Sequence, residues 1–300
     1  MLVGIIAVAG AATLLGIMPS LQKQVLVDGL PMNSLMAYTN LIITLVSLGM
    51  ALLKKRSLRA RPVQAIQAVL MGTVGMLLTA LLLNNAYLYL PVGVAIMLNF
   101  LYPTVVCVVM GTVFRQGFTK LQAAAIVSSI AGMAFLAGKG GDLHPMGLLF
   151  ALVSAFTYGG YLIANEKGPA NELPLETKLF YVSLPGTVIF WILAPATHTL
   201  AAPVGGGIGW LYVLGSGLFT VGGYFLMMYG IHRMGASTAA FVSMLEPIVS
   251  VVFGTIWFHD PITAGVVVGG ILVLASILLI AIDGAHPPRR SAPKGCACGR

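Results

Sequence analysis

Apolar residues run along this chain in long stretches, and polar residues gather in the short segments between them. A bilayer core is about 30 Å thick, so a helix needs about 20 apolar residues to cross it. Because lipid offers the backbone no hydrogen-bond partner, continuous runs of this length form helices. The pattern predicts an all-α integral membrane protein. Its ten predicted transmembrane helices are Leu2–Leu21, Ser34–Leu53, Ala65–Leu90, Val92–Phe114, Leu121–Ala137, Met146–Ala164, Leu179–Ala194, Ile208–Gly230, Gly235–Phe258 and Gly265–Ile282.

The ten predicted helices divide into two sets of five. Because five is odd, the second set enters the membrane upside down, and two inverted halves around a midplane cavity are typical of many secondary transporters. We expect a first five-helix repeat over residues 1–140, a second, inverted repeat over residues 145–283, and a disordered cytoplasmic tail over residues 284–300. Pro103 and Pro247 lie 144 residues apart, at equivalent places in the two halves.

Composition and charge fit this interpretation. Charged residues make up 8% of the chain and hydrophobic residues 58%, whereas globular proteins carry about 25% charged residues. Fourteen of the 16 Lys and Arg residues fall in predicted loops or the tail on one side, and Lys23 and Lys139 on the other. By the positive-inside rule, both termini are cytoplasmic. The net charge of +8 therefore orients the protein and does not indicate nucleic-acid binding.

The first apolar stretch also has to be distinguished from a signal peptide. It lacks a basic leading segment and a small-residue cleavage site, and it is longer than the usual apolar region of a signal. We expect it to be a helix of the mature protein.

Glu246 is the acidic residue that lies deep inside a predicted helix. It comes eleven residues into the ninth stretch, about 16–17 Å deep and near the bilayer midplane. A carboxyl group at that depth costs about 2.5–3.5 kcal/mol on insertion scales, so it is a candidate for function. We predict that Glu246 binds substrate and couples transport to protons. The alternative is a neutral carboxyl that bonds a neighbouring carbonyl and serves structure only.

Polar residues share a helix face with Glu246. Ser243 lies three residues before it and Ser250 four residues after it, which is the spacing of one face. In the first half, Asn99 and Tyr102 are the equivalents of Ser243 and Glu246. Such residues either line a cavity or hold helices together by hydrogen bonds. We predict substrate binding for all of them, with helix association as the alternative.

A proline follows each of these polar stripes. Proline inside a helix frees the carbonyl four residues earlier and permits a kink. For Pro103 and Pro247 the freed carbonyls belong to Asn99 and Ser243. Free backbone groups at this depth must face protein or a water-filled cavity. We predict that the two prolines act as hinges.

Three tyrosines on other predicted helices are further candidates for the cavity wall. Tyr87 lies on the third stretch, Tyr158 on the sixth and Tyr224 on the eighth, and we predict that all three bind substrate. Asn84 and Asn85 lie near the exit of the third stretch. Adjacent helix positions cannot both face a cavity.

Two segments carry a family resemblance. Pro91-Val-Gly-Val-Ala95 leading to Leu101-Tyr102-Pro103 resembles the first half of an EamA-type transporter of the drug/metabolite transporter superfamily. Gly235-Ala-Ser-Thr-Ala239 leading to Leu245-Glu246-Pro247 resembles the second half. The resemblance covers the chain up to its tail. It implies a multi-pass carrier in the plasma membrane, the inner membrane of a bacterium, for amino acids, nucleobases, sugars, amphipathic amines or related metabolites.

The function predicted from these features is secondary active transport by alternating access, with export expected and proton coupling through Glu246. A carboxylate among aromatic rings favours a cation, so we expect a small amino acid or amine as substrate. A passive channel or facilitator, or a carrier of nucleobase- or sugar-type solutes, is the alternative. An enzyme is disfavoured because the five histidines lie in loops, at span ends or in the tail, and no metalloprotease-type H-E-x-x-H motif occurs. We expect no cofactor and no metal, lipid as the surroundings, and a monomer or homodimer.

Overall fold

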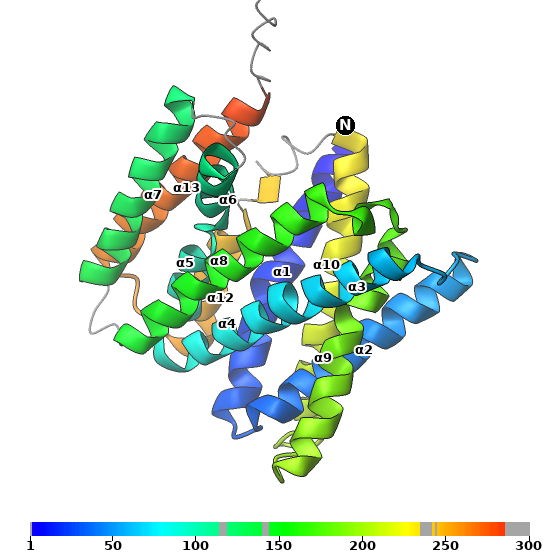
Figure 1. Cartoon of the computed structure of the whole chain (residues 1–300). Coiled ribbons are helices and arrows are strands. Elements are labelled where there is room, and N and C mark those ends of the chain that lie inside the picture. Colours follow the sequence, from blue (N-terminus) through cyan, green and yellow to red (C-terminus); the bar gives the residue numbers. More distant parts are fainter. Residues whose placement is uncertain (1, 114–118, 140–143, 235–241, 244, 286–300) are drawn as a thin grey trace, which may run out of the picture.

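The computed structural model describes residues 2–113, 119–139, 144–234, 242–243 and 245–285, and every regular element in these ranges is a helix (Figure 1). The helices of the first half are α1 (Leu2–Val27), α2 (Met32–Leu53), α3 (Pro62–Leu70), the π-helix η1 (Met71–Leu77), α4 (Leu78–Tyr89), α5 (Val92–Asn99), α6 (Tyr102–Thr112) and α7 (Lys120–Lys139). Those of the second half are α8 (Pro145–Lys167), the short η2 (Pro169–Glu172), α9 (Leu175–Ala196), α10 (Gly207–Met234), α12 (Leu245–Phe258) and α13 (Ala264–Ala285).

Several of these helices have the length and apolarity needed to cross a bilayer. Among the described residues, five stretches meet both requirements, namely α1, α2, the continuous stack Pro62–Tyr89, α9 and the Gly207–Met227 part of α10. Shorter apolar helices cover Val92–Val106, Leu245–Phe258 and Ala264–Ser276. The predicted all-α membrane class is confirmed for the described ranges, whereas the count of ten crossings stays a prediction.

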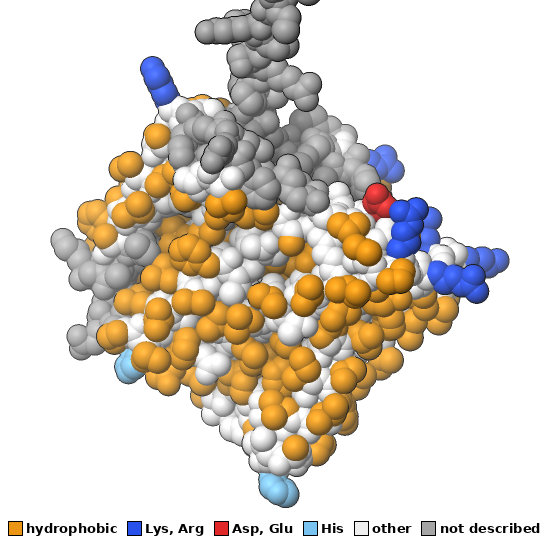
Figure 2. Space-filling view, in the orientation of Figure 1, with side chains coloured by type: hydrophobic (Ala, Val, Ile, Leu, Met, Phe, Trp, Pro, Cys, Tyr) orange, Lys and Arg blue, Asp and Glu red, His pale blue; other side chains and the backbone are white. Residues whose placement is uncertain are grey.

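The surface of the molecule is apolar over a broad band (Figure 2). In this view Lys and Arg side chains lie at the upper and right-hand edges, and histidines at the lower end and on the left. Large apolar side chains such as Ile6, Ile192 and Ile256 are exposed. An apolar surface this extensive would be unfavourable in water and is the surface that acyl chains solvate.

The helices pair as two inverted halves should. α1, from the first crossing of the first half, packs against α10, from the third crossing of the second half. In the same way α4, from the third crossing of the first half, packs against α8, from the first crossing of the second half. Three further pairs, α2 with α9, α5 with α12 and α7 with α13, each join two equivalent helices, and α1 with α12 and α2 with α10 also pack across the halves. A pseudo-two-fold axis in the membrane plane produces this set of pairs.

Matching helix caps add to this symmetry. The Thr119 hydroxyl accepts a hydrogen bond of 3.1 Å from the backbone N–H of Gln122 at the start of α7. The Thr263 hydroxyl accepts one of 3.3 Å from the N–H of Val266 at the start of α13. Both bonds satisfy an N–H that the helix itself leaves unpaired. The two threonines are 144 residues apart, the same offset as the two prolines.

The predicted third stretch is not a uniform α-helix. Its π-helical segment η1 contains Gly72 and Gly75, and π-helical turns occur frequently at functional sites. A Cβ at Gly72 would collide with the carbonyl oxygen of Val182 on α9, and one at Gly75 would lie 2.7 Å from Tyr161 on α8. The two glycines therefore let α9 and α8 approach η1 closely.

Candidate functional site

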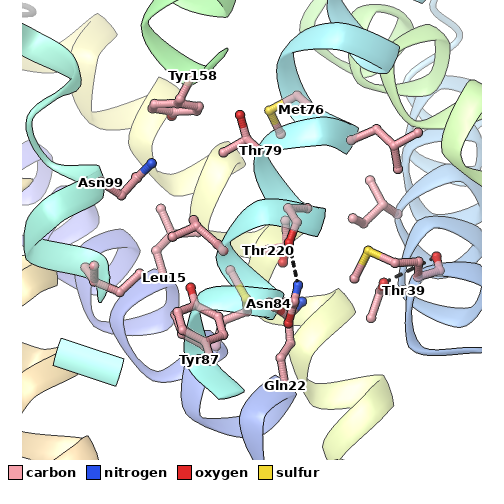
Figure 3. Close-up of a pocket in the computed structure, with 18 of the residues that line it drawn as sticks. Leu15, Gln22, Thr39, Met76, Thr79, Asn84, Tyr87, Asn99, Tyr158 and Thr220 are labelled. Carbon is pink, nitrogen blue, oxygen red and sulfur yellow. Dashed lines mark hydrogen bonds between the residues drawn. The ribbon is translucent and has the colours of Figure 1, made fainter. Parts of the chain in front are cut away.

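A cavity of about 170 Å³ lies among helices of both halves (Figure 3). Apolar side chains make up part of its wall. The polar and tyrosine side chains among the described lining residues are Gln22, Thr39, Asn40, Thr79, Asn84, Tyr87, Asn99, Tyr102, Tyr158, Thr220, Tyr224 and Glu246. They come from α1, α2, α4, α5, α6, α8, α10 and α12, so the site depends on both halves being in place.

Glu246 is the single charged side chain among the described lining residues. It lies in the first turn of α12. No ion pair of Glu246 occurs in the part of the chain that the structure describes. On the other side of its backbone, α1 approaches closely, because a Cβ at Gly16 would lie 2.8 Å from the Glu246 carbonyl oxygen. Glycine at this position is therefore what allows α1 and α12 to enclose the carboxyl group.

Four tyrosines line the same cavity as this carboxyl group. Tyr87, Tyr102, Tyr158 and Tyr224 all lie close enough to Glu246 to interact with its charge. The rings of Tyr102 and Tyr158 meet edge to face, with their centroids 4.8 Å apart. Ring faces and hydroxyl groups around one carboxylate form a setting that suits a cation, because π faces attract positive charge.

Asn99 holds the first half against the second at the cavity wall. It is the last residue of α5, and its amide donates a hydrogen bond of 2.9 Å to the hydroxyl of Ser154 on α8. That hydroxyl in turn donates to the Ala151 carbonyl at 2.6 Å. Asn99 therefore lines the cavity, as its position on the polar helix face predicted. It also makes a hydrogen bond between helices, which is the alternative role given for these polar residues.

Tyr224 bridges α10 to η1. Its hydroxyl contacts the sulfur of Met76 at 3.6 Å. Tyr87 is almost completely buried, with 2% of its surface exposed. Six of the predicted binding residues thus line one cavity, namely Tyr87, Asn99, Tyr102, Tyr158, Tyr224 and Glu246.

The two predicted serines are not among the lining residues. Ser250 is fully buried, and its hydroxyl donates to the Gly16 carbonyl on α1 at 3.0 Å. For Ser250 the cavity-lining prediction is corrected to a bond that holds α1 and α12 together. Ser243 is helical and has an interaction partner of its own. Two helix positions four residues apart point in only approximately the same direction. Ser250 therefore points towards α1, while Glu246 reaches the cavity.

Pro103 begins a helix and does not kink one. Phe100 and Leu101 separate α5 from α6, and Pro103 lies in the first turn of α6. Proline suits a first turn because no N–H is needed there. The kink predicted at Pro103 inside one continuous helix is therefore corrected to a helix start. Pro247 is the third residue of α12, and residue 244 before that helix lies outside the described residues, so its kink and the hinge role of both prolines stay predictions.

The sequence interpretation missed the polar residues of α1, α2 and α10. Gln22 and Thr220 line the cavity. Of the neighbours Asn84 and Asn85, only the structure shows that Asn84 is the one that lines it. A signal existed for Gln22, because Leu15, Pro19 and Gln22 follow helical spacing around a proline inside an apolar stretch. Thr220 carried none, since threonines in apolar helices commonly bond their own backbone.

An all-helical bundle with an apolar surface and a polar cavity between two related halves defines a multi-pass membrane transporter. The chain belongs to the EamA-like transporter family, which matches residues 2–138 and again residues 145–282. The two matches cover the two halves in turn.

Two relatives are transporters. An uncharacterised transporter of Synechocystis sp., sll1319, is 28% identical over 221 residues, which is 71% of this chain and 65% of that protein, just under two thirds of its length. A protein of Streptantibioticus cattleyicolor named "probable terminal-alkyne amino-acid exporter" is 28% identical over 226 residues, 74% of each chain. A solved crystal structure shares the fold, with a TM-score of 0.63 and 18% identity, over 91% of this chain and 97% of that one.

Proposed function

We propose that the protein is a secondary active carrier that exports a small amino acid or amine by alternating access. The observation that carries the proposal is Glu246, a carboxyl group in a cavity built from both halves. An ionised carboxylate in such a place is costly unless a proton or a cation compensates it. Proton and substrate therefore compete for Glu246, and this competition couples the two fluxes.

The lining favours a positively charged group on the substrate. Four tyrosines lie within electrostatic reach of Glu246, and no Lys or Arg is present among the described lining residues. The exporter from Streptantibioticus cattleyicolor, whose name gives an amino-acid substrate, supports the same class. The cavity volume of about 170 Å³ fits a small solute.

The proposed setting is the plasma membrane of a bacterium, with both termini in the cytoplasm. Two features support it, namely the apolar surface band and the strong bias of Lys and Arg towards one edge (Figure 2). The binding site lies within one chain, so a monomer suffices for transport and a homodimer is compatible with it.

Transport by purified protein in liposomes tests the proposal. With an amine such as hexylamine as the probe, an imposed pH gradient should drive accumulation in vesicles with the wild-type protein. The Glu246→Gln variant should lose this driven transport but keep exchange of labelled for unlabelled probe. Driven accumulation that survives the substitution would contradict coupling through Glu246. Flux that neither saturates nor shows counterflow would favour the alternative, a passive channel.

A further inference from the structure

Asn84 lines the cavity and has a buried, unpaired carbonyl oxygen. The residue lines the cavity with 1% of its surface exposed. Its amide nitrogen donates to the Ala80 carbonyl at 2.9 Å, whereas its Oδ1 atom has no hydrogen-bond partner among the described residues. The Ala80 carbonyl can only accept, so the nitrogen must face it and the amide cannot be flipped. The Asn84 acceptor is therefore the atom left for a ligand.

Asn84 belongs to a different level of the cavity from Glu246. On α1, Gly16 contacts Glu246, and Gln22 lies six residues further along, a distance of about 9 Å. On α10, Thr220 lies four residues before Tyr224, about 6 Å away. In Figure 3, Asn84, Gln22 and Thr220 lie together, and Tyr158 and Asn99 lie apart from them.

Two threonine hydroxyls of the cavity wall offer only acceptors to a ligand. The hydroxyl of Thr220 donates to the Ser216 carbonyl at 2.8 Å, and that of Thr39 donates to the Leu35 carbonyl at 2.7 Å. Each hydroxyl hydrogen is thus used within its own helix, and only oxygen lone pairs remain. A carboxylate would meet these lone pairs unfavourably. An N–H donor would satisfy them.

We propose that Asn84, with Thr220 beside it, forms a second subsite that binds an N–H donor at the far end of the substrate. The inference rests on the proposed function, because Glu246 binds the amine at the near end. The substrate class is thereby narrowed to amines and amino acids that carry a second N–H group about 6–9 Å from the first, the distance between the two levels along the helices. A carboxylate at that end would face the lone pairs of Asn84 and Thr220 and is disfavoured.

Three probes of equal chain length test the subsite in purified wild-type protein. Hexylamine ends in a methyl group, hexamethylenediamine in an ammonium group and aminohexanoate in a carboxylate. Binding is measured directly, for example by thermophoresis in detergent. We expect hexamethylenediamine to bind about tenfold more tightly than hexylamine, the gain of one hydrogen bond from a charged donor. Aminohexanoate should bind more weakly than hexylamine.

The variants assign this difference to Asn84. Asn84→Leu should remove the preference for the diamine, measured as the ratio of the hexylamine and hexamethylenediamine affinities within the same variant. Asn85→Leu is the matched control, because the Asn85 amide bonds the Leu81 carbonyl at 2.8 Å and the residue is not among the described lining set. Thr220→Val, which keeps the shape and removes the acceptor, should reduce the preference and serves if Asn84→Leu does not fold.

The outcomes separate this inference from the proposed function. Equal wild-type affinity for hexylamine and hexamethylenediamine, or a preference that persists in Asn84→Leu and Thr220→Val, would show that water alone solvates the Asn84 oxygen. The amine site at Glu246 would then stand without a second subsite. If hexylamine itself binds equally well to wild-type protein and Glu246→Gln, the proposed amine site fails and the subsite fails with it.

Discussion

The Lys23 ammonium lies 3.5 Å from a carboxylate oxygen of Asp260, and this ion pair joins the end of α1 to the segment after α12. The other Asp260 oxygen accepts a hydrogen bond of 3.2 Å from the backbone N–H of Val92, where α5 begins. Asp260 therefore connects the second half to two helices of the first. It does so at one end of the bundle only.

A second ion pair joins the halves at the opposite end. Lys54 follows α2, and its ammonium lies 2.7 Å from the carboxylate of Glu176 in the first turn of α9. Lys23 and Lys54 lie near the two ends of α2, which has 22 residues and is about 33 Å long. Each end of the cavity thus has its own ionic contact between halves, which suits a carrier that opens one end at a time.

We predict that weakening one pair shifts the carrier towards opening at that end. Asp260→Asn should speed the labelling of Gln22→Cys by an impermeant thiol reagent applied from the Asp260 side. A pair worth about 1 kcal/mol corresponds to about a fivefold change. Glu176→Gln should slow the same labelling, because it favours opening at the other end. Lys23→Gln is an intermediate variant, because it removes the ion pair but leaves the hydrogen bond from Val92 to Asp260 intact. It should speed the labelling less than Asp260→Asn does.

Equal labelling of all these variants would contradict the idea that the two ion pairs hold the two ends closed. The reaction is followed on protein that lacks the native cysteines. Modification rates, rather than end points, are compared.

Gly16→Val should destabilise the protein. A Cβ at Gly16 would lie 2.8 Å from both the Glu246 carbonyl oxygen and the Val249 Cβ, and overpacking of this kind costs about 1–3 kcal/mol. Thermal unfolding in detergent measures the effect. Gly49→Val on α2 is the matched control, because nothing lies within 4 Å of a Cβ there. A melting temperature that falls equally in both variants would contradict the close packing of α1 on α12.

Ser250→Ala should affect stability and not binding. Its hydroxyl bonds the Gly16 carbonyl, and such interhelical bonds contribute about 0.6 kcal/mol on average in membranes. We expect a slightly lower melting temperature and unchanged affinity for hexylamine. If Ser250→Ala lost hexylamine binding as Glu246→Gln does, the original prediction that Ser250 binds substrate would be supported.

Inversion of the two halves predicts opposite exposure of two equivalent loops. Ser57 follows α2 and His198 follows α9, and both are exposed. In protein whose Cys107, Cys296 and Cys298 are replaced by serine, an impermeant maleimide added outside cells should label His198→Cys and not Ser57→Cys. Permeabilised cells, in which both label, provide the control. Labelling of both from outside would contradict the inverted arrangement.

Much of the fold followed from composition and spacing, because lipid makes severe demands on a chain. Apolar runs had to become helices, and the described helices overlap the predicted stretches, although the third stretch contains the π-helix η1 and the fourth is divided into α5 and α6. Glu246 was identified as a site residue from depth alone, and it lies at the cavity. The physical reason is that one buried charge among apolar residues has a cost that no other feature of the sequence offsets.

The direction of each polar side chain was a different matter. Glu246 and Ser250 share a stripe, yet one reaches the cavity and the other bonds α1. Asn84 and Asn85 are neighbours with the same side chain, and only Asn84 lines the cavity. In a soluble protein an alternation of polar and apolar faces would separate such cases, because water solvates one face.

In a membrane, lipid and neighbouring helices are equally apolar, so hydropathy does not distinguish the face towards lipid from the face towards protein. The amino-acid sequence by itself therefore determined that this chain is a helical membrane protein that resembles a transporter family, with one acidic residue deep inside an apolar stretch. Tertiary structure decided which helices enclose that residue, that Asn84 and not Asn85 lines the cavity, and that Ser250 holds α1 to α12. Those choices depend on close contacts such as Gly16 against Glu246, which exist only once the two halves have packed together.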